Sequence, residues 1–281
     1  MPDATVILPA RNEGAWLAAT LRSLAATPAG ARFDVVVVDD GSQPPADLGG
    51  GCGLDLRLLR TSGEGAPAAR NRGAAPSAAP ALCFCDAHLE FTPGWLGRLL
   101  GQLPHFDAVC PGISALGRPG RAGFGFSWDE RYGVRWLPPP AGPVEVPFLP
   151  GGCLAVRREA FRAVRGFDAG LAPWGHEDAE FSWALWLGGL RCGVEPAALV
   201  AHRFRPRHPY PVFQHQVDAN LLRLGCVHFD PDRLRRLAAH LGADAARVAR
   251  ASALAAGRRT ALLRGRRRDA AWLCARFALP L

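Results

Sequence analysis

The sequence contains no lysine, and all 33 of its permanently basic side chains are arginines. With 32 glycines and 25 prolines among 281 residues, this usage indicates a GC-rich coding bias. The formal net charge of +8 is therefore not read as a sign of nucleic-acid binding, and we expect no nucleic-acid partner. The charge still suits an anionic substrate or a membrane surface.

Paired cysteines and long apolar runs are also absent. The eight cysteines form no CxxC pair, which argues against common zinc and dithiol motifs, and we expect reduced thiols, several of them buried. The first residues lack the basic region of a signal peptide, and no apolar run is long enough to span a bilayer. We expect a cytoplasmic protein, at most peripheral to a membrane.

What the chain does have is an alternation of apolar, β-rich runs and helical patterns over its first hundred residues. The expected strands are Thr5–Leu8, Asp34–Val38, Asp55–Leu59 and Ala81–Cys85. Helical spacing is found at residues 13–26, 66–75 and 92–103, the last with Thr92 as its expected N-cap. This order predicts an α/β fold with a mainly parallel sheet flanked by helices.

The rest of the chain has a different texture. Residues 111–150 are rich in glycine, proline and aromatic residues without a period, which predicts a long functional loop. A further helix is expected at residues 176–187, ended by Gly188 and Gly189. Residues 231–281 are rich in arginine and alanine at helical spacing, so we expect one domain at 1–230 and a helical extension at 231–281 packed on it.

Polar clusters follow each of the four expected strands. They are "PARNEG" at 9–14, "DDGS" at 39–42, "GEGAPAARNRG" at 63–73 and "DAH" at 86–88. Because ligands of such sheets gather at the carboxyl ends of strands, all four clusters should face one crevice. A dinucleotide fingerprint in "GEGAPA" is disfavoured, since it follows the third strand rather than the first.

Asp86 and His88 lie two residues apart just beyond a strand, so both side chains project to the same side. Cys83 and Cys85 point to the other face and are expected to be structural. An oxygen and an imidazole with open positions suit Mn²⁺ (or Mg²⁺) better than Ca²⁺. Such an ion would neutralise charge on a leaving diphosphate.

Taken together, these motifs resemble glycosyltransferases of the GT-A fold, a Rossmann-like nucleotide-diphospho-sugar transferase architecture, of the family 2 type. The later segments "GFSWDERYGVRW", "PGGCLAVRREAF", "WGHEDAEFSWALWLGG" and "AHRFRPRHPY" are similar to the catalytic domain of polypeptide N-acetylgalactosaminyltransferases. The resemblance covers roughly residues 4–230. It implies a nucleotide-sugar donor, with a UDP-sugar favoured, and a divalent metal.

The resemblance also implies roles for particular residues. The implied metal ligands are Asp86, His88 and His202. The implied donor-site residues are Pro9, Arg11, Glu13, Asp39, Asp40, Arg70, Gly151, Gly152, Trp174, Arg205, His208 and Tyr210. Among the last three, Arg205 would grip phosphate oxygens as part of a lid.

One departure bears on mechanism. The chain has His176-Glu177-Asp178 where those transferases have Gly-Glu-Asn, and Glu-Asp resembles inverting enzymes in which the Asp is the base. We therefore favour inversion, with Asp178 and Glu177 as catalytic residues and Asp178 as the base. The alternatives are a retaining N-acetylgalactosaminyltransferase-like enzyme, a sugar nucleotidyltransferase and a non-catalytic nucleotide-sugar binding module.

The acceptor is not specified by any motif. A saccharide, a peptide, a lipid and a natural product all remain open, with Trp128, Tyr132 and Trp136 as candidate contact surfaces. The arginine-rich helices of residues 231–281 are expected to cover the domain, with contact to an anionic membrane as the alternative.

Overall fold

The computed structural model describes the backbone of all 281 residues and every side chain except that of Pro119. The strands are β1 Ala4–Ala10, β2 Phe33–Asp40, β3 Leu56–Thr61, β4 Ala81–Cys85, β5 Leu89–Phe91, β6 Ala108–Ala115, β7 Arg118–Gly123, β8 Phe126–Trp128, β9 Val134–Trp136, β10 Val144–Glu145, β11 Cys153–Arg157 and β12 Cys192–His202. The helices are α1 Ala15–Ala26, α2 Ala66–Ala74, α3 Trp95–Gln102, α4 Arg158–Ala163, α5 Glu177–Leu187, α6 Gln214–His228, α7 Pro231–His240, α8 Ala245–Leu263 and α9 Ala270–Phe277, with a short 3₁₀ segment at Gly49–Gly53.

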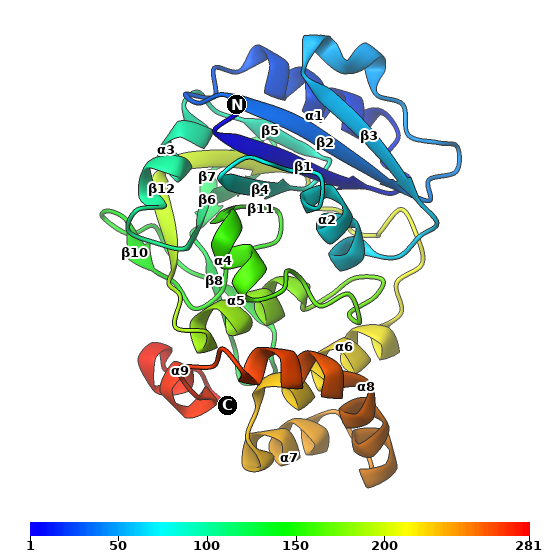
Figure 1. Cartoon of the computed structure of the whole chain (residues 1–281), viewed down its shortest axis with the longest axis vertical. Coiled ribbons are helices and arrows are strands. Elements are labelled where there is room, and N and C mark those ends of the chain that lie inside the picture. The colour runs from blue at the N-terminus through cyan, green and yellow to red at the C-terminus, as the bar shows by residue number, and fades with distance from the viewer.

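A central sheet organises the molecule, in the order β10-β12-β6-β11-β4-β1-β2-β3 (Figure 1). The four strands predicted from the sequence, β1 to β4, form its parallel half. Beyond β4 the sheet is mixed, because β11 runs antiparallel to both β4 and β6. The α/β prediction is confirmed, with the parallel character confined to the N-terminal half and to the β6–β12 pair.

Helices cover both faces of this sheet. Helices α1 and α3 pack on one face through a cluster that includes Leu21 and Trp95. The other face meets α2, α4 and α5 (Figure 1). Alternate strand residues serve the two faces, as Val6 and Ile7 of β1 belong to different clusters. This two-sided burial explains why the strands read as continuous apolar runs.

Two local predictions were wrong. Helix α3 begins at Trp95 after a left-handed Gly94, because the Thr92 hydroxyl does not cap it and donates to the Leu199 carbonyl of β12 at 2.7 Å. Residues 111–150 are not a structureless loop: they contain most of β6 and all of β7 to β10. Short antiparallel strands such as the β8–β9 hairpin carry too few residues for a period to be detected.

The cysteine prediction was correct for the sheet. Cys83 and Cys85 of β4 and Cys153 of β11 are fully buried, with Sγ atoms of neighbours 3.6–3.7 Å apart. All eight cysteines are free thiols. The cluster packs within the core and lies on the other side of the strand from the polar residues described below.

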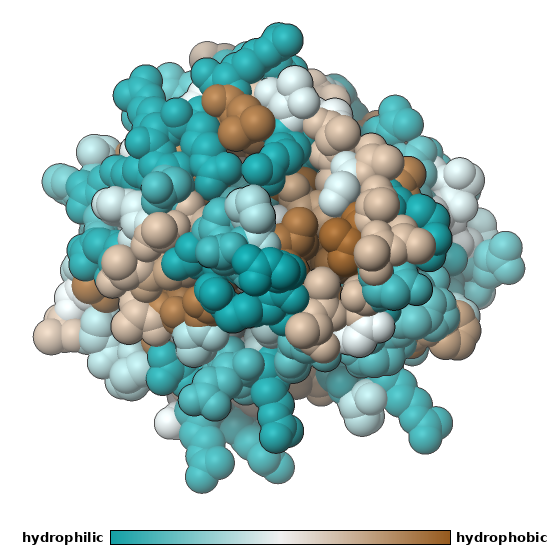
Figure 2. Space-filling model, turned by 90° about the horizontal axis from the view of Figure 1, so that it is seen from below, coloured by the Kyte–Doolittle hydropathy of each residue, from teal (hydrophilic) through white to brown (hydrophobic). Residues whose placement is uncertain are grey.

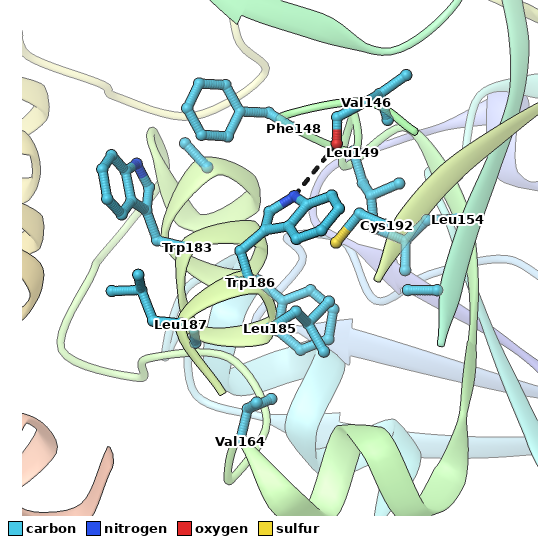
Figure 3. Close-up of a cluster of buried hydrophobic side chains, with 14 of the residues drawn as sticks. Val146, Phe148, Leu149, Leu154, Val164, Trp183, Leu185, Trp186, Leu187 and Cys192 are labelled. Carbon is cyan, nitrogen blue, oxygen red and sulfur yellow. Dashed lines mark hydrogen bonds between the residues drawn. The ribbon is translucent and has the colours of Figure 1, made fainter. Parts of the chain in front are cut away.

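Helix α5 lies at the centre of the apolar cluster on the face of the sheet that also meets α2 and α4. Figure 3 shows Trp183 and Trp186 of this helix among buried side chains from several elements. The Trp186 indole N–H donates to the carbonyl oxygens of Val146 and Pro147 at 3.2 and 3.0 Å, which satisfies its buried polar atom. This packing fixes α5, whose first turn carries Glu177 and Asp178.

Residues 231–281 pack closely on α5 and α6, at the lower end of the view in Figure 1. Leu237 of α7 and Leu273 of α9 belong to the same apolar cluster as Trp186. This shared core shows contact with residues 1–230. Among the described residues, no helix has the length and apolar character needed to cross a membrane.

Three arginines of residues 231–281 lie at the C-terminal ends of α4, α5 and α6. Arg258 donates to the carbonyl oxygens of Val164 and Gly166 after α4, and Arg259 donates to those of Cys226 and Val227 in α6. Arg268 lies near the carbonyl oxygens of Trp186 in α5 and of Leu190 just after it. Cations at helix C-termini satisfy free carbonyls and oppose the negative end of the helix dipole. These three arginines therefore make contacts within the molecule, while Figure 2, viewed from this end, shows hydrophilic side chains mixed with smaller apolar patches.

Arg258 also enters a buried charge network. Its guanidinium contacts both carboxylate oxygens of Glu180 at 2.9 and 3.1 Å, and His228 contacts the same carboxylate at 2.9 Å. The Glu180 side chain is fully buried. Burial opposes its ionisation, but Arg258 and His228 outweigh that effect and lower the pKa of Glu180 to about 2.

The substitution Arg258→Ala tests this network. Removing the cation leaves a buried carboxylate without its ion partner, so we expect the free energy of unfolding to fall by about 3–5 kcal/mol, measured by urea denaturation. Arg250→Ala, exposed on the same helix, should change it by less than about 0.5 kcal/mol. Equal losses in the two variants would contradict a structural role for Arg258.

Candidate active site

A cavity of about 400 Å³ opens at the carboxyl ends of β1, β2 and β4. All four polar clusters predicted to converge line this cavity, through Arg11, Asp40, Gly65 with Arg70, and Asp86. The crevice rule for parallel sheets therefore placed the site correctly. The remaining walls come from segments after β8, β11 and β12.

Asp86, His88 and His202 lie together on one wall. His202 Nε2 is 3.1 Å from Asp86 Oδ2, and His88 Nε2 is 3.8 Å from the same oxygen. The two imidazole rings are 4.7 Å apart between centroids. The distant strand β12 thus brings His202 to the Asp-x-His pair, as the resemblance implied. One donor atom from each residue lies within 4.8 Å of the others.

This cluster fits a divalent cation of intermediate softness. It offers one carboxylate and two imidazoles, a donor set suited to Mn²⁺ with positions left open. Burial by itself would raise the pKa of Asp86, but His202, His88 and Arg70 outweigh it and hold that pKa well below its usual range. The carboxylate is therefore ionised and ready to bind a cation at neutral pH.

Arg70 of α2 connects this wall to α5. Its guanidinium is 3% exposed and donates to Glu177 at 3.0 Å, to Asp86 at 3.2 Å and to the Gly151 carbonyl at 3.1 Å. Glu177 uses its second oxygen to accept the Gly175 N–H at 2.8 Å. Arg70 was predicted to lie near the nucleotide; the structure gives it an additional role that its sequence position did not indicate.

Asp178 has a different environment from its neighbour. Its carboxylate accepts backbone N–H bonds from Gly151 at 3.0 Å and Ala179 at 2.8 Å and forms no ion pair in the described part of the chain. Burial, with the adjacent Glu177 carboxylate, raises the pKa of Asp178 to about 6. A carboxylate with a pKa close to neutrality can accept a proton during a reaction.

Gly151 and Gly152 form the turn between these groups. A Cβ on Gly151 would lie 3.2 Å from Arg70 and 3.3 Å from Asp178. A Cβ on Gly152 would lie 3.2 Å from the His202 ring. A side chain at either glycine would therefore crowd Arg70, Asp178 or His202. The approach of a donor sugar to this backbone stays a prediction.

The two aspartates of "DDGS", Asp39 and Asp40, have different surroundings in the structure. Asp39 accepts the Ser42 and Ala46 N–H groups at 3.0 Å each and does not line the cavity. Asp40 lines it and accepts the N–H groups of Glu64 and Gly65 at 2.7 and 2.8 Å, closing the loop before α2. Of the predicted pair, Asp40 is therefore the residue placed to meet a ligand, together with Pro9 and Arg11.

The segment after β12 lines the cavity through Arg205, His208 and Tyr210, and we call residues 203–213 the lid. His208 packs against Trp174 with ring centroids 4.4 Å apart, and Arg11 lies 5.1 Å from the Tyr210 ring. Arg205, expected to grip phosphate, is paired with Glu13. Glu13, expected at the nucleotide, lines the cavity and contacts Arg205 and His88.

The acceptor prediction was partly wrong. Trp128 is 1% exposed and Tyr132 is 8% exposed, because both pack into the core beneath the β8–β9 hairpin. Trp136 is 39% exposed and lines the cavity. The sequence did not single out the apolar wall around it, which comprises Ile113, Phe126, Val134 and Phe204.

Comparison with known proteins identifies the family to which the chain belongs. Residues 5–165 match the family model "Glycosyl transferase family 2", and residues 137–209 match "N-terminal domain of galactosyltransferase". The chain belongs to glycosyltransferase family 2. Human polypeptide N-acetylgalactosaminyltransferase 16 is 30% identical over 236 residues, covering 75% of this chain and 42% of the relative. Rat polypeptide N-acetylgalactosaminyltransferase 10 is 32% identical over 238 residues, covering 75% and 39%.

Solved structures show the same fold. GalNAc-T7, crystallised with UDP, GalNAc and Mn²⁺, superposes with a TM-score of 0.80 at 21% identity, over all of this chain and 59% of that one. TarS 1-349 from S. aureus, in complex with UDP-GlcNAc, gives 0.59 at 19% identity, over 91% and 72%. The GT-A prediction is confirmed. The chain spans about two fifths of the length of the curated relatives it matches.

Proposed function

We propose that this chain is a metal-dependent glycosyltransferase that moves a sugar from a UDP-sugar to a hydroxyl group, with inversion at the sugar carbon. The observation that carries the proposal is a single cavity containing both halves of such a site. Metal-type ligands, Asp86, His88 and His202, lie on one side of the Gly151–Gly152 turn, and Asp178 lies against the same turn.

The donor proposal rests on this metal wall and on the relatives. Asp86, His88 and His202 would hold a Mn²⁺ or Mg²⁺ ion, which supplies positive charge to a leaving diphosphate. Arg11 and Asp40 would position the nucleoside, since both line the cavity at the strand ends. UDP is named in the structures of GalNAc-T7 and TarS, which supports a uridine nucleotide here.

The base proposal rests on the contrast between two adjacent carboxylates. Glu177 is neutralised by Arg70 and is fully engaged in hydrogen bonds, so it positions Arg70 rather than accepting a proton. Asp178 lacks an ion partner among the described residues and has its pKa raised to about 6. Asp178 would take the acceptor hydroxyl proton as the oxygen attacks the sugar carbon.

A retaining enzyme is the second candidate. It is favoured by the similarity to polypeptide N-acetylgalactosaminyltransferases and by the lid motif from His202 to Tyr210. Retention would not need Asp178 as a base. The acceptor itself would present apolar surface beside its hydroxyl, because Val134, Trp136 and Phe204 remain exposed at the cavity.

The metal proposal predicts that Mn²⁺ strengthens UDP binding. We expect roughly tenfold or more, about 1.4 kcal/mol or more, and loss of that gain in Asp86→Ala, measured by isothermal calorimetry. Asp55→Ala, an exposed aspartate before β3, is the matched control and should behave as wild type. Equal UDP affinity with and without metal in the wild-type protein would reject the metal site.

The base proposal predicts that Asp178→Asn lowers sugar transfer by about 10²- to 10⁴-fold while UDP affinity stays nearly unchanged. Because a base must be unprotonated, wild-type transfer should fall as the pH drops below about 6, the raised pKa of Asp178. The measurement is transfer from a UDP-sugar panel over pH 5–8. Near-wild-type transfer by Asp178→Asn would favour retention instead.

A further inference from the structure

Glu13, in the loop after β1, lies between the metal-type cluster and the lid. Its side chain is only 8% exposed. One carboxylate oxygen is 3.2 Å from His88 Nδ1, and the carboxylate also pairs with Arg205 of the lid, through contacts that include one of 3.3 Å. The loop is also tied to the segment after β2, because the Asn12 side-chain oxygen accepts the Gln43 N–H at 2.8 Å.

The contact with His88 determines which of its nitrogens can bind a cation. An ionised carboxylate only accepts hydrogen bonds, so Nδ1 of His88 carries the proton in this pair. The lone pair then lies on Nε2, the nitrogen that faces Asp86. Metal-binding histidines commonly have their second nitrogen oriented by a carboxylate in this way. His202 differs, because its Nδ1 is buried without a hydrogen-bond partner among the described residues.

The contact with Arg205 ties the lid to the same carboxylate. Asn12 adds a second tie, since its side-chain amide donates to the Pro209 carbonyl at 3.2 Å. Arg11 packs over Tyr210 as a third. The loop after β1 therefore contacts the lid at three successive residues, and Glu13 is the one that also contacts the metal-type cluster.

We infer that Glu13 is a positioning residue that orients His88 for the metal and anchors the lid through Arg205. This inference rests on the proposed function, because it assigns Glu13 to the metal site of that function. This role is additional to the nucleotide contact expected from the sequence. A bound diphosphate would compete with Glu13 for Arg205, so lid contacts and metal-site geometry share one carboxylate.

The experiment measures binding of Mn²⁺ alone, without nucleotide, by isothermal calorimetry. Glu13→Gln keeps the reach of the side chain and an oxygen that can accept from His88, whereas Glu13→Asp keeps the charge but withdraws the oxygen by one methylene. If Glu13 acts by orienting His88, the Mn²⁺ affinity of Glu13→Gln should stay within about threefold of the wild-type value. The affinity of Glu13→Asp should be about 10- to 100-fold weaker.

A purely electrostatic role predicts the reverse order, and that order would overturn the inference, as would wild-type affinity in both variants. Glu90→Ala, an exposed glutamate two residues after His88, is the control and should bind Mn²⁺ as wild type does. Unfolding midpoints without metal verify that each variant is folded. If the wild-type protein binds no Mn²⁺, the metal in the proposed function fails first, and the inference fails with it.

The proposed anchoring of the lid by Glu13 is tested by limited trypsin digestion at the lid arginines. Loss of the Glu13–Arg205 ion pair should speed cleavage after Arg203 or Arg207 in Glu13→Gln and in Arg205→Ala, by about threefold or more if the pair holds the lid by about 0.7 kcal/mol. Arg205→Ala should leave Mn²⁺ affinity unchanged. Unchanged cleavage in both variants would overturn the anchoring role.

Discussion

The arrangement of the site depends on one buried cation, the guanidinium of Arg70. Three carboxylates, those of Asp86, Glu177 and Asp178, lie around it in a partly enclosed cavity. Without a compensating charge, bringing these groups together would cost several kcal/mol per ion. Arg70 donates to groups on β4, α5 and the Gly151 turn, so the same bonds that neutralise the charge also fix the relative positions of these elements.

The position of the site at the strand ends could be predicted from the sequence, because it follows from periodicity and parallel topology. Asp86 and His88 were found by their spacing after a strand. The ion pair between Arg70 and Glu177 could not be predicted in this way. The two residues are 107 positions apart, and each would ordinarily be taken for a charged residue of a helix with no particular partner. The same holds for Glu13, whose partners lie 75 and 192 residues away. Side-chain pairing over such distances is decided by tertiary packing, which local pattern does not encode.

The prediction of exposed aromatic side chains at the site was partly wrong. Trp128 and Trp136 stand in the same hairpin, yet the first is buried against Phe148 and Trp183 and the second is exposed at the cavity. Both lie on short strands, where alternation over three residues cannot tell the inner face from the outer. The arginine-rich extension was expected to cover the domain, and several of its arginines donate to carbonyl oxygens at helix ends or neutralise Glu180. Contact with an anionic membrane, the alternative, stays a prediction.

Glu177 and Asp178 show how one short segment can serve two tasks. The helix start places both carboxylates in the first turn of α5, where burial raises the pKa of Asp178. The neighbouring groups then separate them: Arg70 and the Gly175 N–H compensate Glu177, while Asp178 receives two backbone N–H bonds and no ion partner among the described residues. Environments that differ in this way assign different roles to otherwise similar acids. The charge of Glu177, held by Arg70, in turn raises the pKa of Asp178, so the residue that positions the cation also tunes the proposed base.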